Sequence, residues 1–124
     1  MGRELRYGII GAGSMGREHI LNVNVMGTGV VTALADPHQA SLDASLQLAP
    51  GAKTFSDYRA LLDSGLVDAV VVATPNDTHA AVLKDVLATD IAALIEKPLA
   101  TTMDDCKAIT AWGKNRSALT WMAL

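Results

Sequence analysis

The hydrophobic residues of this chain fall into short, nearly continuous runs, separated by longer stretches in which apolar positions recur at helical spacing. Short continuous runs rich in valine, isoleucine and alanine are typical of strands buried on both faces of a parallel sheet. Six runs predict strands, at residues 5–10, 30–35, 53–55, 67–74, 91–96 and 118–124. The run 67–74, VDAVVVAT, is the most β-branched of them and is expected at the centre of the sheet.

The intervening stretches predict helices at about 14–26, 38–48, 56–62, 79–88 and 102–112. Gly27 and Gly65 are placed to end two of these helices, and Pro50-Gly51 breaks another. Candidate side-chain caps at helix N-termini are Ser14, Ser56 and either Thr101 or Thr102.

Strand and helix alternate along the whole chain with short links. This alternation predicts the α/β class, with a doubly wound parallel sheet covered by helices on both faces and built from right-handed crossovers. A length of 124 residues suits one such domain. Ligands of these sheets bind at the carboxyl ends of the strands, where the strand order reverses.

Composition narrows the class of partner. Net charge is −3 and no basic block stands out, so neither nucleic acid nor an anionic membrane surface is expected as a partner. No apolar run approaches the ~20 residues of a membrane span. Cys106 is the only cysteine, so we expect a buried, unreactive thiol and a cytoplasmic protein without internal disulfides. No metal site is predicted.

The strongest local motif follows the first strand. Gly11, Gly13 and Gly16 fit the pattern G-x-G-x-x-G of a dinucleotide-binding turn. In such a turn the first glycine permits the tight bend, the second allows a pyrophosphate to approach the backbone, and the third lets the helix pack on the sheet. Glycine-rich turns are common, so the motif gains weight only from the strand before it and the helix after it.

An acidic residue stands at the matching distance. Asp36 ends the second predicted strand, twenty residues after Gly16, where a carboxylate can accept hydrogen bonds from the adenosine ribose. A 2′-phosphate would meet a like charge there, so Asp36 favours NAD over NADP. His38 is placed to lie under the adenine. The alternative is that Asp36 and Pro37 form a turn in which the carboxylate caps the next helix.

Polar residues also follow the fourth and fifth predicted strands, at 74–79 and 96–97. Because parallel strands end at one edge of the sheet, these residues and the glycine turn are expected to line one cleft.

The motifs 11–16 (GAGSMG), 35–37 (ADP), 73–79 (ATPNDTH) and 96–100 (EKPLA) together resemble those of the Gfo/Idh/MocA oxidoreductases, in order and over nearly the whole chain. The resemblance implies a Rossmann fold and NAD as cofactor, with the following site. Pyrophosphate contacts are implied for Gly11, Ala12, Gly13, Ser14, Met15 and the turn that closes at Gly16. Ribose contacts of the adenosine are implied for Asp36. The nicotinamide half is implied to lie along Thr74, Pro75, Asn76 and His79. Glu96 and Lys97 are implied at the nicotinamide ribose, with Lys97 facing the substrate as a catalytic residue that assists proton transfer.

Each implied role has a simpler alternative. Lys97 is alternatively a solvated base before a turn-forming proline, His79 a histidine with ordinary hydrogen bonds at a helix end, and Asn76 a helix cap. Trp112 and Trp121 are interpreted as packing residues.

Members of this family carry a second, larger α/β domain that supplies much of the substrate pocket. The resemblance therefore implies that residues 1–124 are the cofactor-binding domain of a longer dehydrogenase acting on a sugar, polyol or related hydroxyl compound. We expect the isolated chain to be inactive and to self-associate as a homo-oligomer or to contact that second domain. Two alternatives remain open: a non-catalytic NAD-sensing module, and an imine or biliverdin-type reductase, which Asp36 disfavours.

Overall fold

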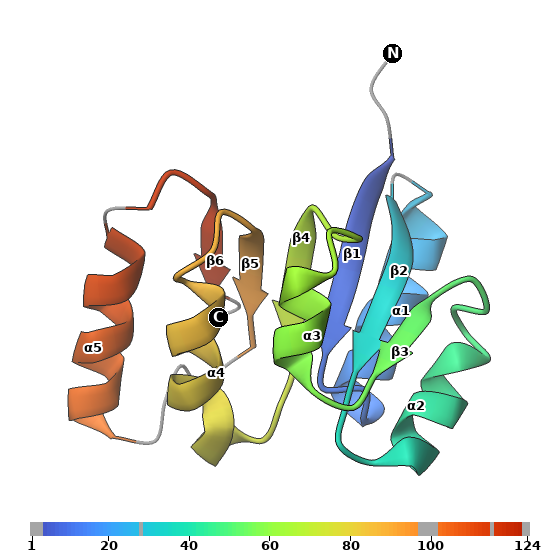
Figure 1. Ribbon diagram of the computed structural model, residues 1–124, viewed down its shortest axis with the longest axis horizontal. Helices are drawn as coiled ribbons and strands as arrows, with labels where there is room; N and C mark the ends of the chain where they lie inside the picture. Colours follow the sequence, from blue (N-terminus) through green and yellow to red (C-terminus); the bar gives the residue numbers. More distant parts are fainter. Residues whose placement is uncertain (1–3, 28, 97–101, 115, 123–124) are drawn as a thin grey trace.

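The computed structural model describes residues 4–27, 29–96, 102–114 and 116–122. Its strands form one six-stranded, wholly parallel sheet in the order β3-β2-β1-β4-β5-β6 (Figure 1). The strands are β1 (Leu5–Ile10), β2 (Gly29–Ala35), β3 (Lys53–Phe55), β4 (Ala69–Val72), β5 (Ala92–Ile95) and β6 (Thr120–Met122). The predicted doubly wound α/β fold is confirmed, and the strand order reverses between β1 and β4.

Helices connect consecutive strands, as the alternation predicted. They are α1 (Ser14–Met26), α2 (Gln39–Leu46), α3 (Tyr58–Asp63), α4 (His79–Val86) and α5 (Met103–Lys114), with a 3-10 turn η1 (Asn76–Thr78) before α4. Strand β4 is shorter than the predicted run 67–74, because the residues on either side of it already belong to the connecting loops.

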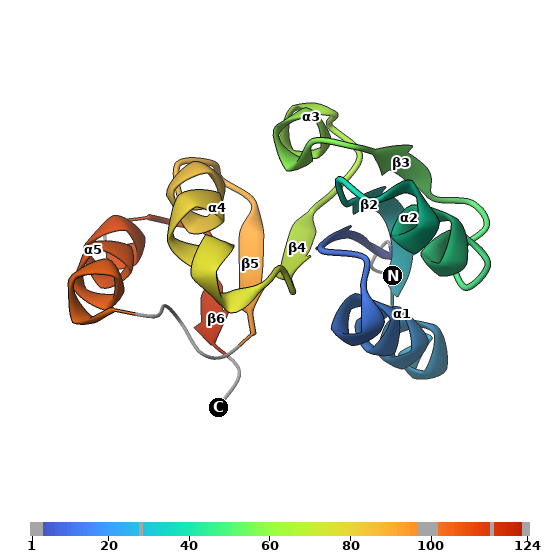
Figure 2. The same cartoon turned by 90° about the horizontal axis from the view of Figure 1, so that it is seen from below.

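Two apolar cores lie on the two faces of the sheet. One face is covered by α3, α4 and α5 and the other by α1 and α2 (Figure 2). Alternation along a strand divides the side chains between the two cores, so that Ile9 packs under α1 while Ile10 packs under α4. Helix α1 therefore lies against the centre of the sheet, next to the point where the strand order reverses.

The helix ends agree with the sequence in part. Gly27 ends α1 in the left-handed conformation with φ of 69°, and Thr102 accepts a hydrogen bond at 3.1 Å from the amide three residues later. The caps predicted at Ser14 and Ser56 are wrong. Ser14 is the first residue of α1 and makes no side-chain cap bond, and α3 is capped by Asp57, whose carboxylate accepts the amide two residues on.

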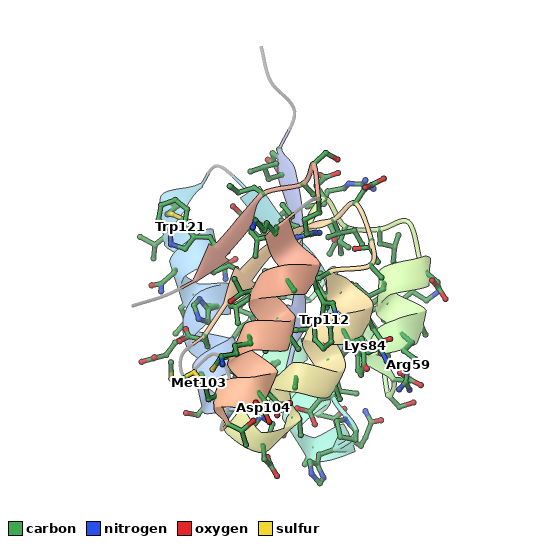
Figure 3. The ribbon with its side chains drawn as sticks, turned by 90° about the vertical axis from the view of Figure 1, so that its left-hand side faces the viewer. Arg59, Lys84, Met103, Asp104, Trp112 and Trp121 are labelled. Carbon is green, nitrogen blue, oxygen red and sulfur yellow. The ribbon has the colours of Figure 1, made fainter. Side chains whose placement is uncertain are left out.

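Three packing expectations have mixed outcomes. Trp112 packs against the core under α4, as expected, and lies toward α4 in Figure 3. Trp121 is 61% exposed on the opposite side of the sheet, so its interpretation as a packing residue is wrong within the described part of the chain. Cys106 is half-buried rather than buried, and Ile109 is the buried residue of α5 among those described.

No helix in the described ranges combines the length and apolar character needed to cross a bilayer.

Candidate functional site

The carboxyl ends of the strands are joined across one edge of the sheet by backbone hydrogen bonds. In each case the residue that directly follows one strand donates its amide to the last residue of a neighbouring strand. The pairs are Gly11 to Ala35 at 2.9 Å, Ala73 to Ile10 at 2.8 Å, Asp36 to Phe55 at 3.1 Å and Glu96 to Val72 at 3.1 Å. The edge that the sequence predicted to hold the site is therefore a continuous ladder, which positions the loops relative to one another.

A cleft of about 840 Å³ opens along this edge. Its walls come from the glycine turn after β1, the end of β2, the loop between β3 and α3, and the segment between β4 and α4. Among the predicted site residues, it is lined by Gly11, Gly13, Met15, Asp36, Thr74 and Pro75. The glycine turn, Asp36 and the segment after β4 thus meet in one cavity, as predicted, whereas Glu96, which was expected in the same cleft, is not among its lining residues.

Two of the glycines are required by close packing. Gly11 has a φ of 97°, and a Cβ there would lie 2.6 Å from the backbone of Ala73. A Cβ on Gly16 would lie 2.0 Å from the carbonyl oxygen of Gly11. The first turn of α1 and the exit of β4 can approach β1 this closely only because both positions lack a side chain.

Gly13 differs from the other two. It is the N-cap of α1, and a Cβ at this position would meet nothing within 4 Å. The free amides and the positive end of the helix dipole face this open space, which suits an anionic group such as a pyrophosphate. Ser14 and Met15 are exposed beside it, while Ala12 is buried.

The carboxylate of Asp36 is held in place by two backbone amides. Its Oδ2 accepts the amide of Ala12 at 2.9 Å, and its Oδ1 accepts the amide of His38 at 2.8 Å. The second bond forms the turn that the sequence offered as the alternative to ribose binding, but Asp36 does not cap α2, whose N-cap is His38. An ionised carboxylate has about four acceptor sites, so these two bonds leave capacity for hydroxyl donors in the cleft.

The segment after β4 combines exposed and buried polar groups. His79 is fully buried, and its Nε2 donates to the carbonyl of Thr74 at 2.9 Å. Among the described residues, neither His79 Nδ1 nor Thr74 Oγ1 has a hydrogen-bond partner. Asn76 begins the η1 turn. His79 therefore supports the loop from beneath, and its predicted contact with a cofactor stays a prediction.

Glu96 follows β5, and its side chain is 16% exposed. Its Oε1 is hydrogen-bonded to Nε2 of His19, which comes from the middle of α1. This partner was not identified in the sequence. Lys97, the predicted catalytic residue, lies outside the described residues, as does the proline after it.

The loop between β3 and α3 supplies a wall that the sequence reasoning missed. Ser56, Asp57, Tyr58 and Arg59 all line the cleft. The signal was available, because the third strand ends at the same edge as the others and the same rule applies to the residues that follow it.

Two side chains of this wall, Tyr58 and Arg59, contact Asp85 of α4. The Tyr58 hydroxyl donates to Asp85, and Arg59 Nε lies 3.3 Å from the same carboxylate. Partial burial and the bond to Asp85 raise the pKa of Tyr58 to about 12. Tyr58 therefore presents a neutral ring to the cleft.

A reversing parallel sheet, a glycine turn open to an anion at a helix N-terminus and a carboxylate after β2 together define a dinucleotide-binding Rossmann domain. The family model of the Gfo/Idh/MocA oxidoreductases, described as the NAD-binding Rossmann fold of that family, matches residues 5–124. The chain belongs to this family, and NAD is its cofactor class.

Individual relatives agree with this assignment. An inositol 2-dehydrogenase of Corynebacterium glutamicum is 37% identical over 100 residues, which are 80% of this chain and 30% of that protein. The crystal structure of myo-inositol dehydrogenase from Lactobacillus casei, in complex with NAD(H) and myo-inositol, superimposes with a TM-score of 0.92 at 31% identity. It covers 98% of this chain and 37% of its own. The WlbA dehydrogenase of Bordetella pertussis, in complex with NADH and UDP-GlcNAcA, gives a TM-score of 0.90 at 26% identity, over 98% of this chain and 35% of its own. The chain thus spans about a third of the length of these relatives.

Proposed function

We propose that this chain is the cofactor-binding domain of an NAD-dependent dehydrogenase that oxidises a hydroxyl of a polyol or sugar. The observation that carries the proposal is the open space at Gly13, because it lies at the N-terminus of α1 and faces a cleft that Asp36 bounds. The cleft has room for a nucleotide, the amides of α1 suit its pyrophosphate, and the carboxylate suits its ribose.

In this proposal the chain holds and orients the cofactor, which when bound supplies the hydride acceptor. Asp36 accepts the ribose hydroxyls of the adenosine while its two backbone bonds keep the carboxylate facing the cleft. Thr74 and Pro75 border the nicotinamide half, and Glu96 lies at the nicotinamide ribose. Lys97 faces the substrate and takes part in proton transfer from its hydroxyl.

The substrate class rests on the relatives. Two structural neighbours hold myo-inositol and a nucleotide sugar, which differ greatly in size although both proteins bind NAD(H). Pocket contacts decide such specificity. We therefore propose that a second domain supplies most of the substrate pocket, and that residues 1–124 alone bind nucleotide without turning over a polyol.

The proposal is tested by measuring the affinities of NADH and NADPH, from the quenching of tryptophan fluorescence or by calorimetry. Wild type is expected to prefer NADH. Asp36→Ala should weaken NADH about tenfold or more, since a charged hydrogen bond is lost, and should reduce the preference over NADPH. The reduced preference is the informative readout, because loss of the Ala12 and His38 bonds would weaken both nucleotides alike.

Asp43→Ala is the matched control, because it removes a carboxylate from the exposed face of α2. Its affinities should equal those of wild type. A folded wild-type chain that binds neither nucleotide at millimolar concentration would contradict the proposal, and so would a preference for NADPH.

A further inference from the structure

The hydrogen bond between His19 and Glu96 links the helix of the glycine motif 11–16 to the sequence motif 96–100. His19 itself belongs to neither motif. His19 lies on α1, the helix that begins at the glycine turn, and Glu96 directly follows β5. They are 77 positions apart in the sequence, and both side chains are more than four-fifths buried. We propose that His19 is a positioning residue, which holds the Glu96 carboxylate for the ribose on the nicotinamide side of the cofactor.

The direction of the two side chains follows from the register of β5. Leu94 contacts the core under α1, and Glu96 lies two residues later, so its side chain leaves the sheet on the same face. His19 reaches it from α1, which covers that face (Figure 2). The backbone amide of Glu96 is bound in turn by the carbonyl of Val72 at 3.1 Å. Two attachments, one to β4 and one to α1, therefore fix both the backbone and the side chain at this point of the edge.

The position of this pair along the edge indicates which part of a nucleotide it serves. Asp36 follows β2, on one side of the glycine turn after β1. Glu96 follows β5, on the other side of that turn and beyond β4. A dinucleotide lies across the reversal point with its pyrophosphate at the glycine turn, so its two halves extend in opposite directions. If the adenosine lies toward Asp36, the second ribose lies toward Glu96. This step rests on the proposed function.

The chemistry of the pair fits a positioning role. An ionised carboxylate only accepts hydrogen bonds, so Nε2 of His19 carries the proton in this contact. The bond engages Oε1 and leaves the acceptor capacity of a second oxygen for a hydroxyl donor. A carboxylate whose rotamer is already held loses less conformational entropy when it binds a ligand. Without His19, the same carboxylate would have to be ordered by the nucleotide.

The test compares ADP with ADP-ribose, which adds the second ribose but no nicotinamide. The dissociation constant of ADP divided by that of ADP-ribose measures the contribution of that ribose to binding. Replacing His19 by Leu should leave ADP affinity unchanged and reduce this ratio about fivefold, which is less than the loss of a whole charged hydrogen bond because the carboxylate is still present but no longer held. His19→Gln retains an N–H donor and should recover most of the ratio. Glu18→Ala, on the exposed side of the same helix, is the matched control and should leave both affinities unchanged.

A double-mutant comparison separates positioning from packing. In a Glu96→Ala background, His19→Leu should have no further effect on the ratio, because its influence passes through the carboxylate. The inference is overturned if His19→Leu weakens ADP and ADP-ribose equally, leaves the ratio unchanged, or acts with the same strength in the Glu96→Ala background.

If the leucine variant does not fold, the glutamine variant decides. It overturns the inference if its ratio equals that of Glu96→Ala. Failure of wild type to bind ADP contradicts the proposed function instead, so the two failures are distinguishable.

Discussion

The glycines of the turn after β1 serve different physical purposes, as the motif implies. Gly16 is enclosed, since a Cβ would overlap the carbonyl oxygen of Gly11, while Gly13 faces open space. The backbone of Gly13, with φ of −79° and ψ of −159°, is in an extended conformation that any residue can adopt. Stability and cofactor affinity therefore depend on different members of the motif.

Substitution at these two positions should separate folding from binding. Gly16→Ala should lower the free energy of unfolding by at least about 2 kcal/mol, since the helix must move away from the strand. Gly13→Val should lower the free energy of unfolding by no more than about 1 kcal/mol, the cost of a poor N-cap residue, since the side chain meets no other atom. It should nevertheless abolish NADH binding, because the side chain occupies the space of the pyrophosphate. Urea denaturation and NADH titration of both variants check this, and equal stability losses would contradict it.

Tyr58 gives a prediction about pH. Its pKa of about 12 in the folded chain lies above its ordinary value of 10.0, mainly because of burial and then because of the bond to Asp85. The folded state therefore retains a proton that the unfolded state releases between about pH 10 and 12. The contribution of this proton to the free energy of unfolding should be fully present below pH 10 and be lost as pH rises through that window.

Ultraviolet titration of the phenolate measures this pKa. Asp85→Asn should lower it toward 10, because both the charge and the strong acceptor are lost. Asp63→Asn, on the same helix as Tyr58 but without that bond, is the control and should leave it unchanged. An Asp85→Asn variant with an unchanged pKa would assign the shift to burial alone.

Among the elements, the edge strand β6 is joined to the rest of the sheet by the side chain of Arg116 as well as by its backbone pairing. Strand β6 pairs only with β5, and Arg116 joins it to the loop before β5. The guanidinium donates to the carbonyl of Thr89 at 2.9 Å and to Thr120 Oγ1 at 2.6 Å. Burial lowers the pKa of Arg116. This half-buried clamp holds an edge strand in which Thr120 is half-buried and Trp121 is exposed.

Replacing Arg116 by Ala should therefore loosen β6 while leaving the centre of the sheet intact. We expect a loss of about 1–3 kcal/mol, from carbonyls left without a donor, and faster hydrogen exchange at the amide of Ala93, which bonds to Leu119. Exchange at Ile10 and Val72 should change less. Lys114→Ala on the nearby exposed end of α5 is the control. Uniform acceleration across all strands would contradict the idea of a local clamp.

For the molecule as a whole, the face of the sheet that carries α1 and α2 is covered at one end and exposed at the other. Helices α1 and α2 cover β1 to β3 on that face (Figure 2). At the β6 end, Trp121 is 61% and Leu119 64% exposed. Trp121 lies in register with Leu94, so the two form one apolar surface. Exposed apolar surface of this kind favours association.

We therefore predict that the chain self-associates through this surface. Light scattering at rising concentration should show species larger than a monomer, and Trp121→Lys should shift the equilibrium toward the monomer without affecting NADH binding. The matched variant Val25→Lys, on the exposed side of α1, should not have this effect. A monomeric wild type at high concentration would overturn the prediction.

Much of this architecture could be predicted from local patterns. Strand β1, strand β3 and helix α1 have the predicted bounds, since a continuous apolar run, a threonine beside an aromatic residue or a glycine stop is encoded within a few neighbouring residues. The sequence also predicts that the glycine turn, Asp36 and the loop after β4 lie at one edge, because parallel strands end together. Spacing and strand direction therefore determine which loops form the cleft.

Contacts between distant residues were decided only by the tertiary structure. Nothing near His19 in the sequence indicates that it bonds to Glu96, because that pairing depends on which face of β5 the carboxylate leaves and which helix covers it. The choice of Asp57 over Ser56 as a cap depends on where α3 begins against the sheet. The exposure of Trp121 likewise depends on which helices extend far enough to cover β6. A local pattern specifies an element and its buried face, whereas the partner on that face is specified by packing across the whole sheet.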